Sequence, residues 1–181
     1  MFRRETFEEA GGYDPSFRLA QDYDLWSRLL RHGDFGNVPE IVYRYRTGHD
    51  NISNTSADRQ ASSAIRTCRR EFKAMTDEDL GEEEARVLLN FWWMRPPVPA
   101  TTSVNISVSR AMRKVALSFF RQHPDLRKEE FRIYRDITAK WWWWTKRVPP
   151  YSIERAVYIR NFLVWGMRAI WARARSGDAG D

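Results

Sequence analysis

Two glycines, a short loop and an acidic tripeptide precede a helical pattern near the start of this chain, and that order constrains the fold more than any other feature. Residues 11–28 read GGYDPSFRLAQDYDLWSR. Gly11 and Gly12 predict a turn, because glycine adopts positive φ without steric cost. Apolar side chains then recur at helical spacing: Leu25, Trp26, Leu29 and Leu30. The sequence therefore predicts a turn, a loop and a helix in close succession.

Asp22 and Asp24 lie at the start of that predicted helix. Free backbone N–H groups and the helix dipole favour negative charge at this position. One interpretation is that both carboxylates only cap the helix. The other is that a carboxylate here is held at the mouth of a functional site. The residues alone leave both interpretations open.

A short strand is predicted over residues 37–46, which read NVPEIVYRYR. Apolar and polar side chains alternate there enough to indicate a short strand. Val38, Ile41, Val42 and two tyrosines supply the apolar ones. The strand makes the N-terminal region, residues 1–54, a small α/β piece.

Residues 1–53 contain GGYD, QDYDLW, VYRYR and GHDNIS in this order. They resemble the last third of the catalytic domain of family 2 glycosyltransferases, which are inverting enzymes of the GT-A fold. The resemblance implies that Asp22 is the catalytic general base, with Gln21 in place of the glutamate that usually precedes it, and that Asp24 is the helix cap. The chemistry needs such a base, because inverting transfer requires a group that takes the proton of the acceptor hydroxyl.

The same resemblance implies contacts with both substrates. Gly11 and Gly12 correspond to the loop on the acceptor side, where flat backbone can lie against the incoming sugar. Three residues become candidates for contacts with the donor diphosphate or a metal ion: Arg44, Arg46 and His49. Arginine suits phosphate because its planar fork pairs with two oxygens. The alternatives are solvated strand-edge charges for the arginines and an ordinary loop residue for the histidine.

The tripeptide Asp22-Tyr23-Asp24 also has the D-x-D form of the metal site in many sugar-nucleotide transferases. We exclude a metal site there, because that motif ends a buried apolar strand and RLAQ precedes it here. The family's own D-x-D and its nucleotide-binding half are expected upstream of Met1. A complete enzyme would then use a nucleotide-diphosphate sugar, an acceptor and Mn²⁺ or Mg²⁺. For this chain alone we expect no cofactor and no activity.

Beyond residue 54 the sequence predicts five helices, and the last three of the four breaks between them contain proline. Their ranges are 57–75, 82–93, 104–122, 128–146 and 152–175. We therefore divide the chain into residues 1–54, the end of a GT-A domain, and residues 55–181, a helical appendage. The predicted fold is mostly α with a small α/β piece.

Basic and aromatic side chains concentrate towards the C-terminus. Residues 127–175 carry 12 basic and four acidic side chains, whereas the whole chain has a net charge of +6. The run Trp141–Trp144 cannot face one core, because four consecutive helical residues point all round the helix. We interpret this run and the last helix as an anchor on an anionic membrane surface; the alternative for the run is a helix covered by other helices. The apolar residues that we assign to the anchor in the last helix are Val157, Tyr158, Phe162, Trp165, Ile170 and Trp171.

Nucleic acid is the competing partner for such a basic, aromatic region, since aromatic rings among arginines can stack on bases. The sequence has no RNP motif, zinc pattern or helix-turn-helix signature, so we favour the membrane. We expect a cytoplasmic protein that is peripheral at the inner face of the membrane. The alternative function is a helical membrane-associated or scaffold protein whose first 53 residues are a catalytic relic.

Overall fold

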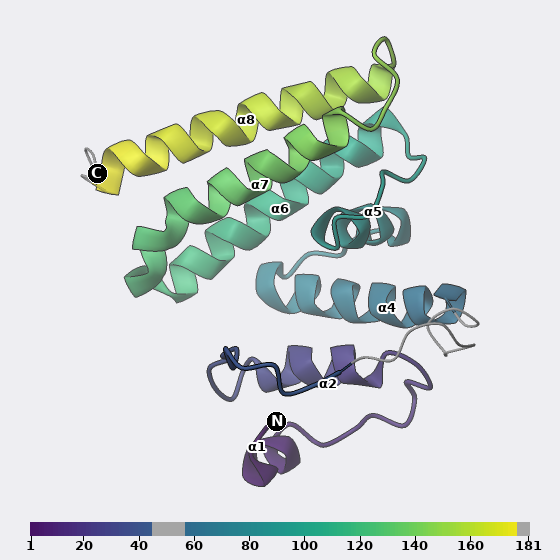
Figure 1. Ribbon diagram of the computed structural model, residues 1–181, viewed down its shortest axis with the longest axis vertical. Helices are drawn as coiled ribbons and strands as arrows, with labels where there is room; N and C mark the ends of the chain where they lie inside the picture. The colour runs from purple at the N-terminus through teal and green to yellow at the C-terminus, as the bar shows by residue number, and fades with distance from the viewer. Residues whose placement is uncertain (45–56, 177–181) are drawn as a thin grey trace. The chain divides into compact units, whose positions relative to one another are not determined.

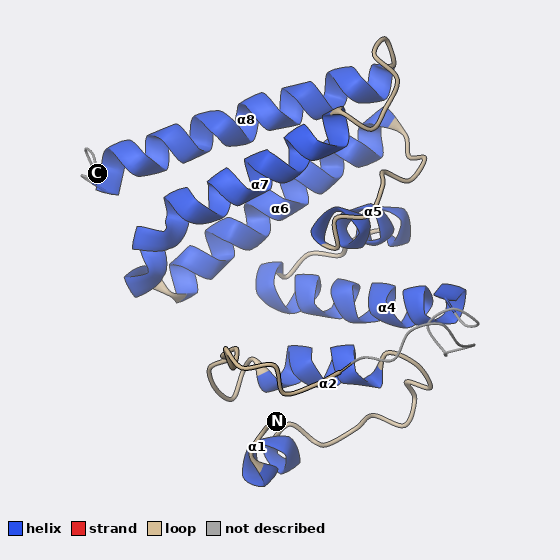
Figure 2. Cartoon of the chain, viewed as in Figure 1, coloured by secondary structure: helices blue, strands red, loops and turns tan. Residues whose placement is uncertain are grey.

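The computed structural model describes residues 1–44 and 57–176 of the 181-residue chain. The described residues form seven α-helices and no β-strand. Figure 2 colours the described residues as helix and loop, with no strand. Contacts divide the chain into two compact units, residues 1–71 and residues 72–181. The prediction of a mostly α fold is confirmed. The predicted division at residue 54 falls in a segment that the structure does not describe.

Three described helices belong to the N-terminal unit: α1 (Arg4–Glu9), α2 (Gln21–Leu29) and most of α4 (Ala57–Thr76) (Figure 1). Helix α2 buries Leu25 and Leu29, and α4 buries Ala64 and Ile65. Phe17, from the loop that precedes α2, is buried as well. This small core fixes α2, the helix that carries the acidic tripeptide.

The predicted strand over residues 37–46 is wrong for residues 37–44, which are irregular. Their apolar side chains lie in solvent, and Ile41 is 91% exposed. A strand is stable only when its backbone groups bond to a neighbouring strand, and the described part of the chain contains no second strand. The described residues therefore supply no neighbouring strand with which residues 37–44 could pair.

Beyond α4, the described part of the C-terminal unit comprises α5 (Glu82–Trp92), α6 (Thr102–Gln122), a 3₁₀ helix (Pro124–Glu129), α7 (Glu130–Thr145) and α8 (Ile153–Ser176). The predicted helices are confirmed, with ends that differ by at most two residues. Prolines break the chain between α5 and α6 and again between α7 and α8, because proline cannot continue a helix. Helices α7 and α8 pack along each other, and α6 contacts both α5 and α8 (Figure 1).

Aromatic rings fill the core of the C-terminal unit. Phe91, Trp141, Trp144 and Tyr158 form a cluster with ring centroids 4.6–5.8 Å apart. Trp141 and Trp144 are fully buried, whereas Trp142 is 44% exposed. The prediction that the tryptophan run cannot face one core is therefore confirmed, and two of its rings are core residues that are not available to a membrane.

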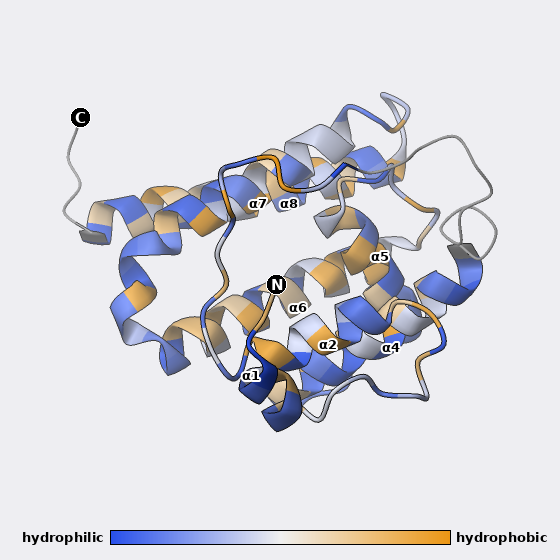
Figure 3. Ribbon diagram, turned by 60° about the horizontal axis from the view of Figure 1, so that its bottom comes forward, coloured by the Kyte–Doolittle hydropathy of each residue, from blue (hydrophilic) through white to orange (hydrophobic). Residues whose placement is uncertain are grey.

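Apolar and polar residues follow one another along the long helices of this unit (Figure 3). None of the described helices is both long and apolar enough to cross a bilayer. Three residues that we assigned to a membrane anchor, Val157, Tyr158 and Trp165, are buried within the unit instead. Ile170 and Trp171 are exposed, as an anchor requires.

Candidate functional site

The glycine pair ends α1 in a Schellman motif. The φ angle is 79° at Gly11 and 63° at Gly12. The Gly12 N–H donates to the Phe7 carbonyl and the Gly11 N–H to the Glu8 carbonyl, each at 2.9 Å. These are the two hydrogen bonds by which a Schellman motif closes a helix. The predicted turn is confirmed, and both glycines have a structural reason to be there, since a residue with a Cβ is strained at such φ values.

Arg28 joins this turn to α2. Its Nη2 donates to the Gly12 carbonyl at 2.7 Å, and its Nη1 donates to the Ala10 carbonyl. The same guanidinium binds Oδ2 of Asp24, one helical turn earlier, at 2.6 Å. Arg28 therefore holds the turn against α2, and it already occupies the carbonyl oxygen of Gly12, one of the two glycines that we predicted to face an acceptor.

The carboxylate of Asp24 is fully buried and lies between two arginines. Oδ2 accepts from Nε and Nη2 of Arg28, and Oδ1 accepts from Nη1 of Arg70 in α4. The predicted role of Asp24 as a helix cap is wrong, because α2 begins earlier, at Gln21, and its N-cap is Ala20. Asp24 lies inside the helix, and its N–H donates to the Ala20 carbonyl at 3.2 Å. Its side chain turns into the interior, where the arginines compensate its charge.

Further charged groups connect Asp24 to the surface between α2 and α4. Arg70 donates to Glu71 Oε1 and to Ser27 Oγ, each at 2.8 Å, and Arg31 donates to Glu71 Oε2 at 2.6 Å. Burial disfavours the charged form of Arg70, but its hydrogen bonds to Asp24 and Glu71 outweigh burial and raise its pKa. We call Asp24, Arg28 and Arg70 the Asp24 cluster. It joins α2 to α4 through charged hydrogen bonds.

Asp22, the predicted general base, has a different environment from Asp24. It is exposed in the first turn of α2, and its Oδ1 accepts from the Tyr23 N–H at 2.8 Å. The preceding Ala20 has a left-handed conformation, with φ 55° and ψ 33°, so the chain turns sharply where α2 begins. The carboxylate of Asp22 is accessible, and the Asp24 cluster holds its helix in place. A general base needs both accessibility and a fixed position.

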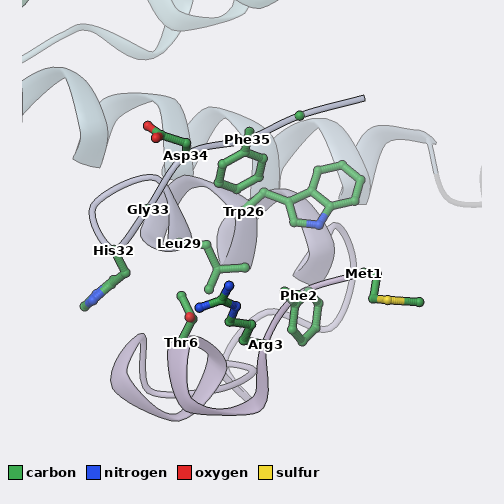
Figure 4. A pocket seen from close by; sticks show the side chains of 11 residues that line it. Met1, Phe2, Arg3, Thr6, Trp26, Leu29, His32, Gly33, Asp34 and Phe35 are labelled. Atoms are coloured by element: carbon green, nitrogen blue, oxygen red, sulfur yellow. The ribbon is translucent and has the colours of Figure 1, made fainter. Parts of the chain in front are cut away.

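A pocket of about 720 Å³ lies elsewhere in the N-terminal unit (Figure 4). Figure 4 shows Trp26 and Phe35 on one side of it and Phe2 and Arg3 on the other. Asp22 and the glycine pair are not among the residues that line it. The pocket and the predicted base are therefore separate features of this unit.

Of the three residues predicted to contact the donor diphosphate or a metal, only Arg44 lies within the described residues. Arg44 is exposed at the end of the described segment 1–44, and Arg46 and His49 lie outside the described residues. Within residues 1–44 and 57–176, no group of three histidine, cysteine or acidic side chains could hold a metal ion. The described residues therefore do not fit the Mn²⁺ or Mg²⁺ that the resemblance implies. We derive no chemistry from a metal.

Cys68 in α4 provides a test of packing near this site. Burial, together with the nearby charge of Glu71, raises the pKa of its thiol from 9.0 to about 11. At pH 8 the folded protein should then hold about 100-fold less thiolate than the unfolded chain, and only the thiolate reacts. We expect iodoacetamide to alkylate Cys68 at pH 8 more slowly by about that factor in buffer than in concentrated urea. Equal rates would contradict the burial of this thiol.

Comparison with known proteins finds no match to this chain among protein family models, curated proteins or solved structures. Function must therefore be argued from the residues and their geometry. The residues that the sequence did not reveal are Arg28 and Arg70. The spacing of Asp24 and Arg28, one helical turn apart, is a signal for the first, whereas no local pattern connects Asp24 to Arg70, 46 residues later.

Proposed function

We propose that residues 1–53 are the acceptor-side, base-bearing segment of a family 2 glycosyltransferase. The reaction is the transfer of a sugar from a nucleotide-diphosphate sugar to an acceptor hydroxyl, with inversion. The described residues contain no strand layer that could hold a nucleotide. The proposal therefore includes a nucleotide-binding half that lies outside these 181 residues, and the chain alone is proposed to be inactive.

The observation that carries the proposal is the exposed apolar segment after α2. Its large side chains are all more than half exposed: Phe35, Val38, Ile41, Val42 and Tyr43. Large apolar side chains that are exposed so close together in the sequence are typical of a segment that another element covers. The segment also alternates as a strand does, so a sheet is the partner that fits it best. A neighbouring strand would satisfy its backbone groups and bury its side chains at the same time.

In this proposal Asp22 takes the proton from the acceptor hydroxyl as that oxygen attacks the anomeric carbon of the donor. The new C–O bond forms on the face opposite the nucleotide diphosphate, whose bond to the sugar breaks, so the configuration inverts. The exposed position of Asp22 leaves room for an acceptor. The Asp24 cluster contributes by fixing α2, because a base is effective only within hydrogen-bond reach of its proton.

The coding DNA directly upstream of Met1 supplies the first test. We expect in-frame codons for an apolar strand followed by a D-x-D motif. The correspondingly longer protein should hydrolyse or transfer sugar from a uridine or guanosine diphosphate sugar in the presence of Mn²⁺. A longer protein without such a strand and without turnover would contradict the proposal.

In the active longer form, Asp22→Asn is expected to lower kcat by at least about 10²-fold, because an amide cannot take the proton. The matched control is Asp58→Asn, which changes another exposed aspartate in the first turn of a helix of the same unit. It should retain full turnover. Circular dichroism of both variants checks that the fold is intact. Near-normal turnover of Asp22→Asn would rule out Asp22 as the base.

A further inference from the structure

Helix α8 exposes an apolar stripe along its length. The stripe consists of Ile159, Leu163, Met167, Ile170 and Trp171. Four of these residues follow at intervals of four, and Ile170 lies beside them, so all five share one face of the helix. Leu163 is 54% and Met167 57% exposed. The opposite face is buried in the unit through Tyr158 and Trp165, so the stripe points away from the core that holds α8.

Arginines border the α8 stripe on both sides. The helix contains five arginines and a single acidic residue, Glu154. At about 100° per residue, Arg160 lies at one edge of the stripe and Arg155 at the other. A long arginine side chain can lay its methylene groups along an apolar surface and place its guanidinium at the polar boundary. The stripe with its borders is therefore apolar in the middle and cationic at both edges.

We propose that the α8 stripe binds the surface of an anionic lipid bilayer, with the helix lying in the plane of the headgroups. The apolar side chains enter the boundary between headgroups and acyl chains, and the arginines bind lipid phosphates and carboxylates. Arg160, Asn161 and Arg168 within the helix oppose a spanning orientation. This proposal uses only residues of the C-terminal unit and is independent of the transferase proposal.

Charge favours a bilayer as the partner of the stripe over a second copy of this chain or a nucleic acid. Two α8 stripes packed against each other would place the arginines of one copy near those of the other, and like charges across an interface are unfavourable. A nucleic acid would bind the arginines, but it would leave Leu163 and Met167 in water, since bases stack on rings rather than on aliphatic side chains. An anionic bilayer compensates the arginines and covers the aliphatic residues together.

Liposome flotation of the full 181-residue chain tests the proposal. We expect the chain to float with vesicles of phosphatidylcholine and phosphatidylserine and to remain in the soluble fraction with phosphatidylcholine alone. Combining Leu163→Glu with Met167→Glu should weaken binding at least about 100-fold, because two apolar side chains are lost from the acyl boundary and negative charge is added. Arg155→Gln and Arg160→Gln should each weaken it about fivefold at low salt, and salt should reduce that difference.

Leu117→Glu is the matched control, since Leu117 is an exposed leucine of the same unit that belongs to α6. This variant should float like the unaltered chain, and unchanged circular dichroism shows that the variants fold. The proposal is overturned if the chain stays soluble with anionic vesicles, or if the double glutamate variant floats equally well. A dimer in sedimentation velocity that the two glutamates disrupt would make a second copy the occupant. Binding of single-stranded RNA that needs the arginines but tolerates the glutamates would replace lipid with nucleic acid.

Discussion

Replacing Trp144 by alanine is expected to lower the unfolding free energy of the C-terminal unit by about 3–5 kcal/mol, the usual loss for a large buried ring. Trp144 is fully buried, and its ring centroid lies 5.4 Å from those of Phe91 and Tyr158. Its indole N–H donates to the Arg95 carbonyl at 3.0 Å. The substitution therefore leaves a cavity and removes a hydrogen bond. Urea denaturation followed by far-UV circular dichroism measures the loss.

Trp142→Ala is the matched control within the same run of tryptophans. Trp142 is exposed, and its ring contacts Phe162 at a centroid distance of 5.2 Å. Losing that contact should lower the unfolding free energy of the C-terminal unit by only about 1 kcal/mol. Equal losses for Trp142→Ala and Trp144→Ala would contradict the orientation of α7.

Phenylalanine substitutions at Trp141 and Trp144 distinguish the contribution of the indole hydrogen bond to stability from that of ring packing. The indole N–H of Trp141 is buried and has no hydrogen-bond partner among the described residues. Trp141→Phe removes that unsatisfied donor, whereas Trp144→Phe breaks the bond to Arg95. We expect Trp141→Phe to be less destabilising than Trp144→Phe by about 1 kcal/mol, which is the net value of a typical hydrogen bond.

The helices of the C-terminal unit could be predicted from the sequence because their signals are local. Thr101 caps α6 by accepting the Val104 N–H at 3.3 Å. At the start of α5, the Glu84 carboxylate accepts the Gly81 N–H at 2.7 Å. Prolines between the helices end them. Each signal acts over a few residues, so it does not depend on what the helix packs against.

The sequence predicts less well which face of each of these helices is buried. Trp141 and Trp144 are three residues apart and share a face, but the sequence does not show which face α5 and α8 cover. The same holds for α8, where the aromatic residues Tyr158 and Trp165 are buried and the aliphatic Leu163 is exposed. Both faces of α8 are rich in apolar residues, so hydropathy alone does not choose between them.

In the N-terminal unit, the features that escaped prediction depend on distant partners. Residues 37–44 have the alternation of a strand but no neighbouring strand among the described residues. An aspartate near a helix start gives the same local signal whether it caps the helix or enters a buried cluster. For Asp24 the difference is made by Arg70, which belongs to another helix. The turn at Gly11 and Gly12 was predictable because its hydrogen bonds are local.

Asp24→Asn is expected to lower the unfolding free energy of the N-terminal unit by about 3 kcal/mol, because it leaves Arg28 and Arg70 without their buried anion. Asparagine has almost the same shape, so the loss reports charge rather than volume. Asp22→Asn makes the same substitution in the same helix at an exposed side chain. It should change the unfolding free energy by no more than about 0.5 kcal/mol. Urea denaturation of both variants gives the comparison.

A double-mutant cycle with Arg70→Gln tests whether Asp24 acts through Arg70. Each single variant leaves the other residue's charge in place without this partner, so each includes the cost of an uncompensated charge. In the double variant both charges are absent. We expect its loss of stability to be smaller than the sum of the single losses by about 1–3 kcal/mol. Additive losses would mean that the two side chains do not interact in solution, and that the Asp24 cluster does not hold α2 against α4. Coupling of the expected size would identify Asp24 as the residue that anchors the helix carrying Asp22, a role that its position near a helix start does not reveal.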